Sequence, residues 1–271
     1  MSHSLEETHL TALAEWWEEM GVEVDRSALK QAAPAKTLKA HQEPAAAPAP
    51  VATRSSLGKL GSLEARVAAA QSLAANAQTL DALKEAIEGY EGCPLKAGAN
   101  KTVVFDGVQG APVMVIGEGA GGTEDQVGLP FVGKAGKLLD RMLASIGLSR
   151  ETNTFITNVT YWRPPGNRNP EADELAVCRP FVDRMVELGA PKLIISAGGV
   201  SAKSLLETKT GIMRLRGKPV QYITPGGVSA PLVPIFHPAY LLRRPQDKSR
   251  AWRDLLLIQK LLAADGAFSS H

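Results

Sequence analysis

Short apolar runs alternate with longer amphipathic segments from residue 101 onward, and this alternation limits the fold of the 271-residue chain more than any other feature. A short apolar run bounded by turn residues is typical of a buried strand, and a longer amphipathic segment is typical of a helix. Strands are predicted at 112–117, 154–158, 192–198 and 232–237. Helices are predicted at 134–146, 171–188, 200–206 and 247–264. This order predicts a single α/β domain with a central four-stranded, mostly parallel sheet flanked by helices.

The N-terminal segment follows a different pattern from this region. Apolar and aromatic side chains, including Trp16 and Trp17, recur at helical spacing over residues 8–20 and predict a short helix within residues 1–28. Residues 29–60 are rich in Ala and Pro without periodicity, which is typical of a semi-extended linker that cannot bury a core. We therefore expect a tethered N-terminal helix that docks either on the domain or on a protein partner.

The folded domain is expected to span residues 61–265 and to begin with two helices within residues 62–89. Thr79 and Asp81 stand at the start of the second helix and are residue types that cap helix N-termini. No run of about 18 apolar residues is present, and the first ten residues are polar and acidic, so we expect neither a membrane span nor a secretory signal. Only two cysteines are present, which is too few for a disulfide framework. We expect a cytoplasmic protein.

Charge is distributed unevenly along the chain, although the net charge is only +2. Residues 201–260 contain 11 Lys and Arg against 3 Asp and Glu, whereas residues 1–60 contain 6 against 8. A concentrated positive surface is what binding to a phosphate backbone requires. An ordinary solvated surface is the alternative interpretation of the same residues.

Distinctive residues stand where the four predicted strands end: Gly117-Glu118, Asn158, Gly198 and His237. In open, mostly parallel sheets, ligands bind beyond the carboxyl ends of the strands. We therefore expect the functional site to gather at this edge of the sheet.

The first strand runs into a glycine-rich turn in which Gly117, Gly119 and Gly122 formally match the dinucleotide-binding pattern GxGxxG. A nucleotide-binding turn of this kind requires a helix to begin at the third glycine, so that its N-terminus faces the pyrophosphate. The following residues are broken by a Gly and a Pro, and a helix is expected only from Lys134. The pattern therefore favours a turn whose backbone approaches some other ligand over a dinucleotide site.

Four motifs taken together resemble the family 4 type of uracil-DNA glycosylases. They are GEGAGGTED (117–125), PFVGKAG (130–136), TNVTYWRPPGNRNP (157–170) and HPAYLLR (237–243). The resemblance covers roughly residues 90–262. It implies a single α/β domain that binds uracil-containing DNA, flips the uracil out of the helix and hydrolyses its N-glycosidic bond, releasing uracil and leaving an abasic site for base excision repair.

The resemblance also implies which residues bind the base. Phe131 would stack on the flipped uracil, and Gly119 would lie against it in the glycine-rich turn. Asn158 would read the base edge, because one amide offers an acceptor for uracil N3–H and a donor for O4. Core packing is the alternative for Phe131, and a turn or helix cap is the alternative for Asn158.

The catalytic roles implied by the resemblance fall on three residues. His237 would stabilise the uracilate anion as the glycosidic bond stretches, in either its neutral or its protonated form, with a structural histidine as the alternative. Glu118 and Glu124 would orient the attacking water or support the positive charge that develops on the sugar. Glu124 has two further alternatives, capping the following turn or excluding the methyl group of thymine.

Contacts to DNA are expected from residues outside the base site. Leu242 and Arg243 end the HPAYLLR motif, in a region that enters the duplex in this family, where they would fill the space left by the flipped base. Arg163, Arg168 and Arg216 would contact phosphates, with solvated surface arginines as the alternative.

The chain departs from the family at the cofactor. Members usually bind a 4Fe–4S cluster through four cysteines, but here Cys93 and Cys178 match only the second and fourth. Tyr90 and Trp162 stand in the other two positions, and both are large enough to fill the vacated volume with apolar area. Two thiolates cannot hold a cluster that normally takes four. We predict that the chain binds no iron–sulfur cluster, no other metal and no other cofactor.

Two other functions are compatible with the same motifs. The chain could be a glycosylase that removes another deaminated base, such as hypoxanthine or xanthine, or a DNA- or abasic-site-binding protein that has lost catalysis. A nucleotide-binding enzyme is a more distant alternative. We expect a monomer in each case.

Overall fold

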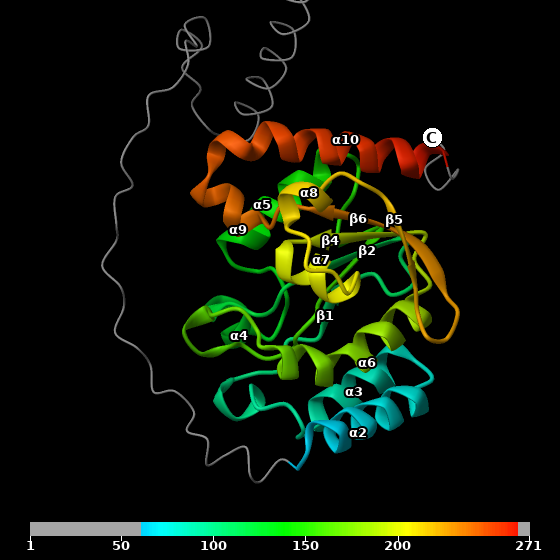
Figure 1. The fold of residues 1–271 in the computed structure, drawn as a ribbon. Helices are drawn as coiled ribbons and strands as arrows, with labels where there is room; N and C mark the ends of the chain where they lie inside the picture. The colour runs from blue at the N-terminus through cyan, green and yellow to red at the C-terminus, as the bar shows by residue number, and fades with distance from the viewer. Residues whose placement is uncertain (1–60, 265–271) are drawn as a thin grey trace, which may run out of the picture. The chain divides into compact units, whose positions relative to one another are not determined.

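The computed structural model describes residues 61–264, which contain a six-stranded mixed sheet in the order β1-β3-β2-β4-β6-β5 (Figure 1). Four strands pair in parallel at its centre: β2 (Val113–Gly117), β3 (Thr154–Asn158), β4 (Leu193–Ala197) and β6 (Ser229–Ile235). The outer strands are antiparallel to their neighbours: β1 (Phe105–Gly107) and β5 (Val220–Ile223). The four predicted strands are the central ones, and the prediction of a four-stranded sheet was wrong because both outer strands were missed.

The two missed strands carry weak signals in the sequence. β1 has only three residues, none of them fully buried, and β5 buries only Tyr222 among its four. Neither strand shows the apolar run or strict alternation that distinguishes a strand in sequence. Pairing with β3 and β6 therefore determines these strands more than their own residues do.

Helices cover both faces of the sheet, with α2, α3 and α6 on one side and α5, α9 and α10 on the other (Figure 1). The helices on the first side, together with the shorter α7, are α2 (Leu63–Asn76), α3 (Leu80–Gly89), α6 (Ala172–Gly189) and α7 (Gly199–Leu205). The second group, which α8 joins, comprises α5 (Lys134–Ala144), α8 (Ile212–Leu215), α9 (Pro238–Arg243) and α10 (Lys248–Ala264). A short helix α4 (Gly122–Val127) and three 3-10 turns, η3 (Lys96–Gly98), η4 (Pro165–Asn167) and η5 (Pro245–Asp247), complete the described elements.

Strand β2 shows how the sequence produces two cores. Met114 and Ile116 pack with the core under α2, α3 and α6, whereas Val113 and Val115 pack with the core under α5 and α10. Successive side chains of a strand point to opposite faces, so an uninterrupted apolar run requires cover on both. The buried sheet holds the strand ends, and therefore the site, on a rigid base.

The predicted helices are confirmed within the described residues. The two N-terminal ones are α2 and α3, and Thr79 caps α3 by accepting a hydrogen bond of 3.1 Å from the Ala82 N–H. The predicted N-terminal helix and the linker at residues 29–60 lie outside the described residues. None of the helices in residues 61–264 is long and apolar enough to cross a membrane.

Candidate active site

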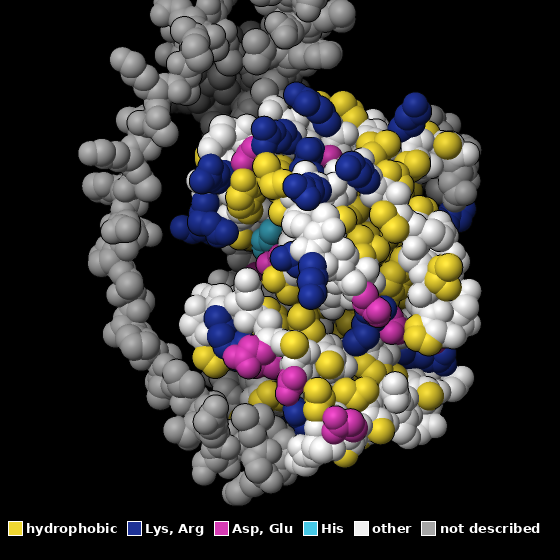
Figure 2. All heavy atoms as spheres, viewed as in Figure 1, with side chains coloured by type: hydrophobic (Ala, Val, Ile, Leu, Met, Phe, Trp, Pro, Cys, Tyr) yellow, Lys and Arg dark blue, Asp and Glu magenta, His cyan; other side chains and the backbone are white. Residues whose placement is uncertain are grey.

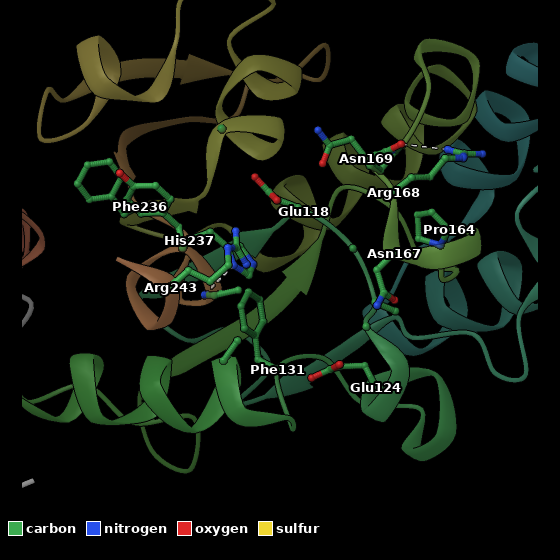
Figure 3. A pocket seen from close by; sticks show the side chains of 18 of the residues that line it. Glu118, Glu124, Phe131, Pro164, Asn167, Arg168, Asn169, Phe236, His237 and Arg243 are labelled. Carbon is green, nitrogen blue, oxygen red and sulfur yellow. Dashed lines mark hydrogen bonds between the residues drawn. The ribbon is translucent and has the colours of Figure 1, made fainter. Parts of the chain in front are cut away.

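A cavity of about 490 Å³ lies beyond the carboxyl ends of the parallel strands (Figure 3). Its walls come from the segments that follow β2, β4 and β6, and from the loops around α4, η4 and α9. Its size falls within the range of about 300–1,000 Å³ that is typical of small-ligand sites. Of the residues expected at this edge, Glu118 and His237 line it, whereas Gly117, Asn158 and Gly198 are not among its lining residues.

The ring of Phe131 lies against the ring of His237 in this cavity. Their centroids are 5.5 Å apart and their planes differ by 28°, so the two rings are stacked (Figure 3). Phe131 precedes α5 and is only 6% exposed, yet its ring forms part of the cavity wall. Both aromatic side chains thus contribute to the cavity wall, with their rings in contact.

Asn158 is the last residue of β3 and pairs in register with Gly117 of β2. It is 1% exposed, and neither its Nδ2 nor its Oδ1 has a hydrogen-bond partner. A Cβ at Gly117 would overlap both the Asn158 amide oxygen and the Phe131 ring, so the glycine makes room for the two side chains to lie together. A buried polar group without a partner costs about 1–3 kcal/mol. A ligand edge that offers a donor and an acceptor would recover this free energy.

The tautomer of His237 follows from its position at the N-terminus of α9. Its Nδ1 accepts a hydrogen bond of 3.1 Å from the Ala239 N–H, so the proton of the neutral ring lies on Nε2. Burial lowers the pKa of His237 below its ordinary value of 6.5, and the positive charge of Arg243 acts in the same direction, against the carboxylates of Glu118 and Glu124. His237 is therefore a neutral donor through Nε2–H at physiological pH.

Both predicted carboxylates line the cavity, and each is held by backbone N–H groups. Glu118 Oε1 accepts from the Val200 N–H at 2.9 Å, which joins the end of β2 to the start of α7. Glu124 Oε1 accepts from two N–H groups, those of Val132 at 3.0 Å and Gly133 at 2.8 Å, at the start of α5. Glu124 thus organises the loop that carries the aromatic wall, in addition to any role towards a ligand.

Comparison with known proteins identifies the family. The profile of the uracil DNA glycosylase superfamily matches residues 105–256. This chain belongs to that superfamily. The type-4 uracil-DNA glycosylase of Sulfurisphaera tokodaii is 36% identical over 189 residues, covering 68% of this chain and 84% of that protein. Those of Thermotoga maritima and Archaeoglobus fulgidus are 34% and 37% identical, covering 64% and 68% of this chain and 88% and 94% of their own lengths.

The glycine-rich turn of this superfamily member differs from the prediction in one respect. Helix α4 begins at Gly122, so the expectation that no helix begins before Lys134 was wrong. The helix has only six residues and ends at Gly128 in a left-handed conformation, which explains why its apolar pattern was not recognised. A Cβ at Gly121 would lie 2.7 Å from Glu124 Oε2, so a carboxylate lies beside the start of the helix. Its negative charge disfavours the pyrophosphate of a dinucleotide there.

Gly119 lines the cavity in the same turn. A Cβ at this position would lie 2.6 Å from Thr160 Oγ1, which itself donates to the Glu118 carbonyl at 3.1 Å. Any side chain at Gly119 would therefore push the turn away from the segment after β3. The glycine allows the backbone itself to form this part of the wall.

Two of the arginines predicted to contact phosphates donate paired hydrogen bonds to a carboxylate, and the third, Arg163, lies 3.9 Å from Asp125 Oδ2. Arg168 donates two hydrogen bonds to Glu174, at 2.8 and 2.6 Å, beside the N-terminus of α6. Arg216 donates two to Asp254, at 2.9 and 2.7 Å, and lies 5.0 Å from the ring centroid of Phe236. A phosphate would have to share these guanidinium groups with their partners, so both phosphate contacts stay predictions.

The remaining predicted DNA contacts differ in their surroundings. Arg163 donates to Asn167 Oδ1 at 2.8 Å, and its side chain is 34% exposed. Arg243 lines the cavity, and Leu242 next to it is 45% exposed. An exposed leucine beside the cavity mouth is compatible with insertion into DNA.

The two cysteines belong to the same buried core as a group of aromatic rings. Cys93 and Cys178 are both buried, and the hydrogen bond between them, together with burial, raises the pKa of the Cys178 thiol well above its usual range. The ring of Tyr90 lies 6.5 Å from that of Trp162 and 5.2 Å, edge to face, from that of Phe181. These distances are those of packed aromatic pairs.

The same region does not fit the cluster that the family usually binds. Tyr90 donates to the Arg66 carbonyl at 2.8 Å, and Trp162 Nε1 donates to Thr102 Oγ1 at 3.1 Å. Both rings are thus fixed where the family has thiolates. Within residues 61–264, no group of three or more His, Cys, Asp or Glu side chains is placed to hold a metal ion.

One residue at the site has no signal in the sequence. Arg150 binds the backbone of Pro130 and Phe131, but it lies 20 and 19 positions away from them in the chain. Neither its spacing nor its neighbours indicate this contact. The contact depends on the folded arrangement of the loop between α5 and β3.

Proposed function

We propose that this protein is a monofunctional uracil-DNA glycosylase that flips uracil out of DNA and hydrolyses its N-glycosidic bond, leaving an abasic site for base excision repair. The observation that carries the proposal is the Asn158 amide, which is buried beside Phe131 with both polar atoms unpaired. An enzyme that acts on a base takes it out of the stack and into a pocket. Asn158 is not itself a lining residue of the cavity, but its amide lies beside Phe131, which is. The type-4 relatives support the same substrate.

Selectivity for uracil follows from the two ends of the Asn158 amide. Uracil presents the N3–H donor next to the O4 acceptor, which match Oδ1 and Nδ2 respectively. Cytosine presents an acceptor at N3 and a donor at N4. The same amide would therefore place an acceptor against an acceptor and a donor against a donor. Stacking on Phe131 holds the ring plane while the amide reads the edge.

His237 acts on the departing base. As the bond between C1′ and N1 breaks, its electron pair stays on the uracil and negative charge develops on O2. The neutral Nε2–H donates a hydrogen bond to this oxygen, which stabilises the charge only as it forms. The Ala239 N–H fixes the ring through Nδ1, so little reorganisation is required.

Glu118 is the carboxylate that we assign to the attacking water. Its Oε1 is fixed by the Val200 N–H, and its position after β2 lines the cavity near the expected sugar. It orients the water that adds to C1′, takes up the proton that the water loses and opposes the positive charge on the sugar. No lysine lines the described cavity, which supports hydrolysis without a Schiff base. Glu124 supports this site from the start of α5.

DNA would approach the face that surrounds His237. Figure 2 shows Lys and Arg side chains gathered over the region of α8, α9 and α10, whereas most of the Asp and Glu side chains on this face lie further down. Such a field attracts the phosphate backbone. Leu242 and Arg243 stand at the cavity mouth, where they would fill the gap left by the flipped base.

We further propose that the protein works without an iron–sulfur cluster. Tyr90 packs against Trp162 and Phe181 in the core that also holds Cys93 and Cys178, and two thiols do not supply the four ligands that such a cluster takes. Packing of these rings would hold the loop after β3 in the place of metal coordination. Iron and sulfide analysis of the purified protein tests this proposal.

An excision assay on single- and double-stranded oligonucleotides tests the function. Uracil-containing DNA should break after alkali treatment, because an abasic site is alkali-labile, whereas the same DNA with cytosine should stay intact. Preferential breakage at hypoxanthine or xanthine would show a glycosylase for another base. Tight DNA binding without base release would show a non-catalytic binding protein. The monomeric state, the cytoplasmic location and a partner for residues 1–28 stay predictions.

A further inference from the structure

Phe131 has an unusual backbone conformation for a large side chain. Its φ is +54°, in the left-handed region that glycine adopts readily and bulky residues rarely do. For a residue with a side chain, this conformation is less populated than the ordinary backbone by a factor of about 5–30. The conformation directs the ring at His237 (Figure 3). Some other contact must therefore hold the backbone in place.

The carbonyl of Phe131 shows what holds it. On one side it lies against Gly136 of α5, where a Cβ would overlap the carbonyl oxygen. On the other side, Arg150 Nη2 donates a hydrogen bond of 2.8 Å to this oxygen, and Nη1 donates one of 3.2 Å to the carbonyl of Pro130. The guanidinium thus binds two successive carbonyls of the strained segment.

Arg150 is itself fixed from two further elements. Its Nη1 donates to Asp106 Oδ2 of β1 at 2.7 Å, and its Nε donates to Asp140 Oδ1 of α5 at 2.9 Å. The side chain is only 17% exposed. Charge-assisted hydrogen bonds from a partly buried, planar guanidinium are among the stronger ones in proteins. Lysine cannot reproduce this arrangement, because its ammonium is a single point of charge.

We propose that Arg150 is a positioning residue for base stacking, which holds Phe131 in its left-handed conformation so that the ring presents its face to the flipped base. The inference rests on the proposed uracil excision and deepens it. Arg150 does not line the cavity, so its effect on the reaction passes through Phe131. Asp106 and Asp140 hold the guanidinium, and Gly136 leaves space for the carbonyl.

Arg150→Met in the full chain tests the proposal. The single-turnover rate of uracil release should fall about 5–30-fold, the factor that the left-handed conformation represents. The affinity for uracil-containing DNA should stay unchanged, because Arg150 does not line the cavity. Arg150→Lys keeps the charge without the planar fork and should restore only a small part of the rate. If Arg150→Met does not fold, the test is the single-turnover rate of Arg150→Lys, which should still be lower than that of the wild type.

A double-mutant cycle separates positioning from general destabilisation. In the Phe131→Ala background no ring remains to be positioned, so adding Arg150→Met should cause no further loss of rate. Arg179→Met is the matched control, because Arg179 is also a partly buried arginine that pairs with a carboxylate, Asp183, and a carbonyl, that of Ser204. It should lose stability but keep the wild-type rate at a temperature where it is folded.

The outcomes distinguish this inference from the function on which it rests. A wild-type protein that releases no uracil would contradict the proposed function. Only the positioning role would be overturned if the wild-type protein releases uracil but Arg150→Met lowers the single-turnover rate by the same factor with and without the Phe131 ring. A fully active Arg150→Lys variant would overturn the requirement for the planar fork and with it the proposal.

Discussion

Replacement of Trp162 by alanine tests how the region of the missing cluster is built. Trp162 is fully buried and contacts the rings of Tyr90 and Tyr161 at 6.5 and 6.0 Å between centroids. Deleting a buried tryptophan costs about 3–5 kcal/mol in lost transfer free energy and residual cavity. The neighbours have little freedom to close the cavity, because the Tyr90 hydroxyl is tied to the Arg66 carbonyl. We therefore expect a cost in the upper part of that range.

Urea and thermal unfolding followed by far-UV circular dichroism measure this cost without relying on the deleted fluorophore. For a domain of this size, about 3–5 kcal/mol corresponds to a fall in Tm of roughly 6–20 °C. The m value should stay unchanged if the folded state keeps its compactness. Cys178→Ala is the matched control, since it removes one buried heavy atom and should cost about 0.5–1.5 kcal/mol, as Ile→Val does.

Two results would refute this reasoning. The first is a Trp162→Ala variant as stable as the wild type, which would show that the ring does not fill the region. The second is a Cys178→Ala variant that unfolds, together with near-stoichiometric iron and sulfide in the anaerobically purified wild type. That combination would mean that the cysteines ligate a metal and that the aromatic packing is not what holds the region.

Three further predictions concern catalysis and DNA binding. His237→Ala should lower the rate of excision by about 10²–10³-fold, the usual effect of deleting one transition-state donor, while DNA affinity stays nearly intact; a loss confined to affinity would remove this role. Burial lowers the pKa of His237 below 6.5, so the neutral donor persists at neutral pH and the acid limb of the single-turnover rate should have an apparent pKa below 6.5; an acid limb with an apparent pKa at or above 6.5 would contradict a neutral His237. The logarithm of the DNA affinity should fall steeply and linearly with the logarithm of the salt concentration. An affinity independent of salt would exclude phosphate contacts by the basic face.

The central strands and the longer helices could be predicted from sequence because each carries its own signal. The five residues of β2 are all buried, and such a run is visible in the sequence without any tertiary contact. Strand β5 has no such signal, since only Tyr222 of its four residues is buried, and its place is set by pairing with β6. Helix α4 was missed for a related reason. It has only six residues before its C-cap at Gly128, which is too few turns for a helical hydrophobic period to be visible in the sequence.

The cavity could be predicted because strand ends in a parallel sheet meet at one edge, which brings Glu118 and His237 to the same wall. The division of labour between the two carboxylates could not be predicted, since it depends on which backbone N–H groups meet them after folding. The same is true of the His237 tautomer, which follows from the Ala239 N–H. Arg150 had no local signal, because its partners come from three separate segments of the chain.

The release of free uracil by the wild type and by Asn158→Asp, measured under single-turnover conditions, tests the central claim most directly. The wild type should release uracil and leave cytosine in place. Asn158→Asp should lose at least about 10²-fold in the rate on uracil, because the carboxylate has no donor for O4 and leaves a buried group unpaired. Asn158→Gln, which keeps the amide but displaces it, is the control for the chemistry of the group. An Asn158→Asp variant that releases uracil at the wild-type rate would contradict the account, since the buried amide would then not be what reads the base.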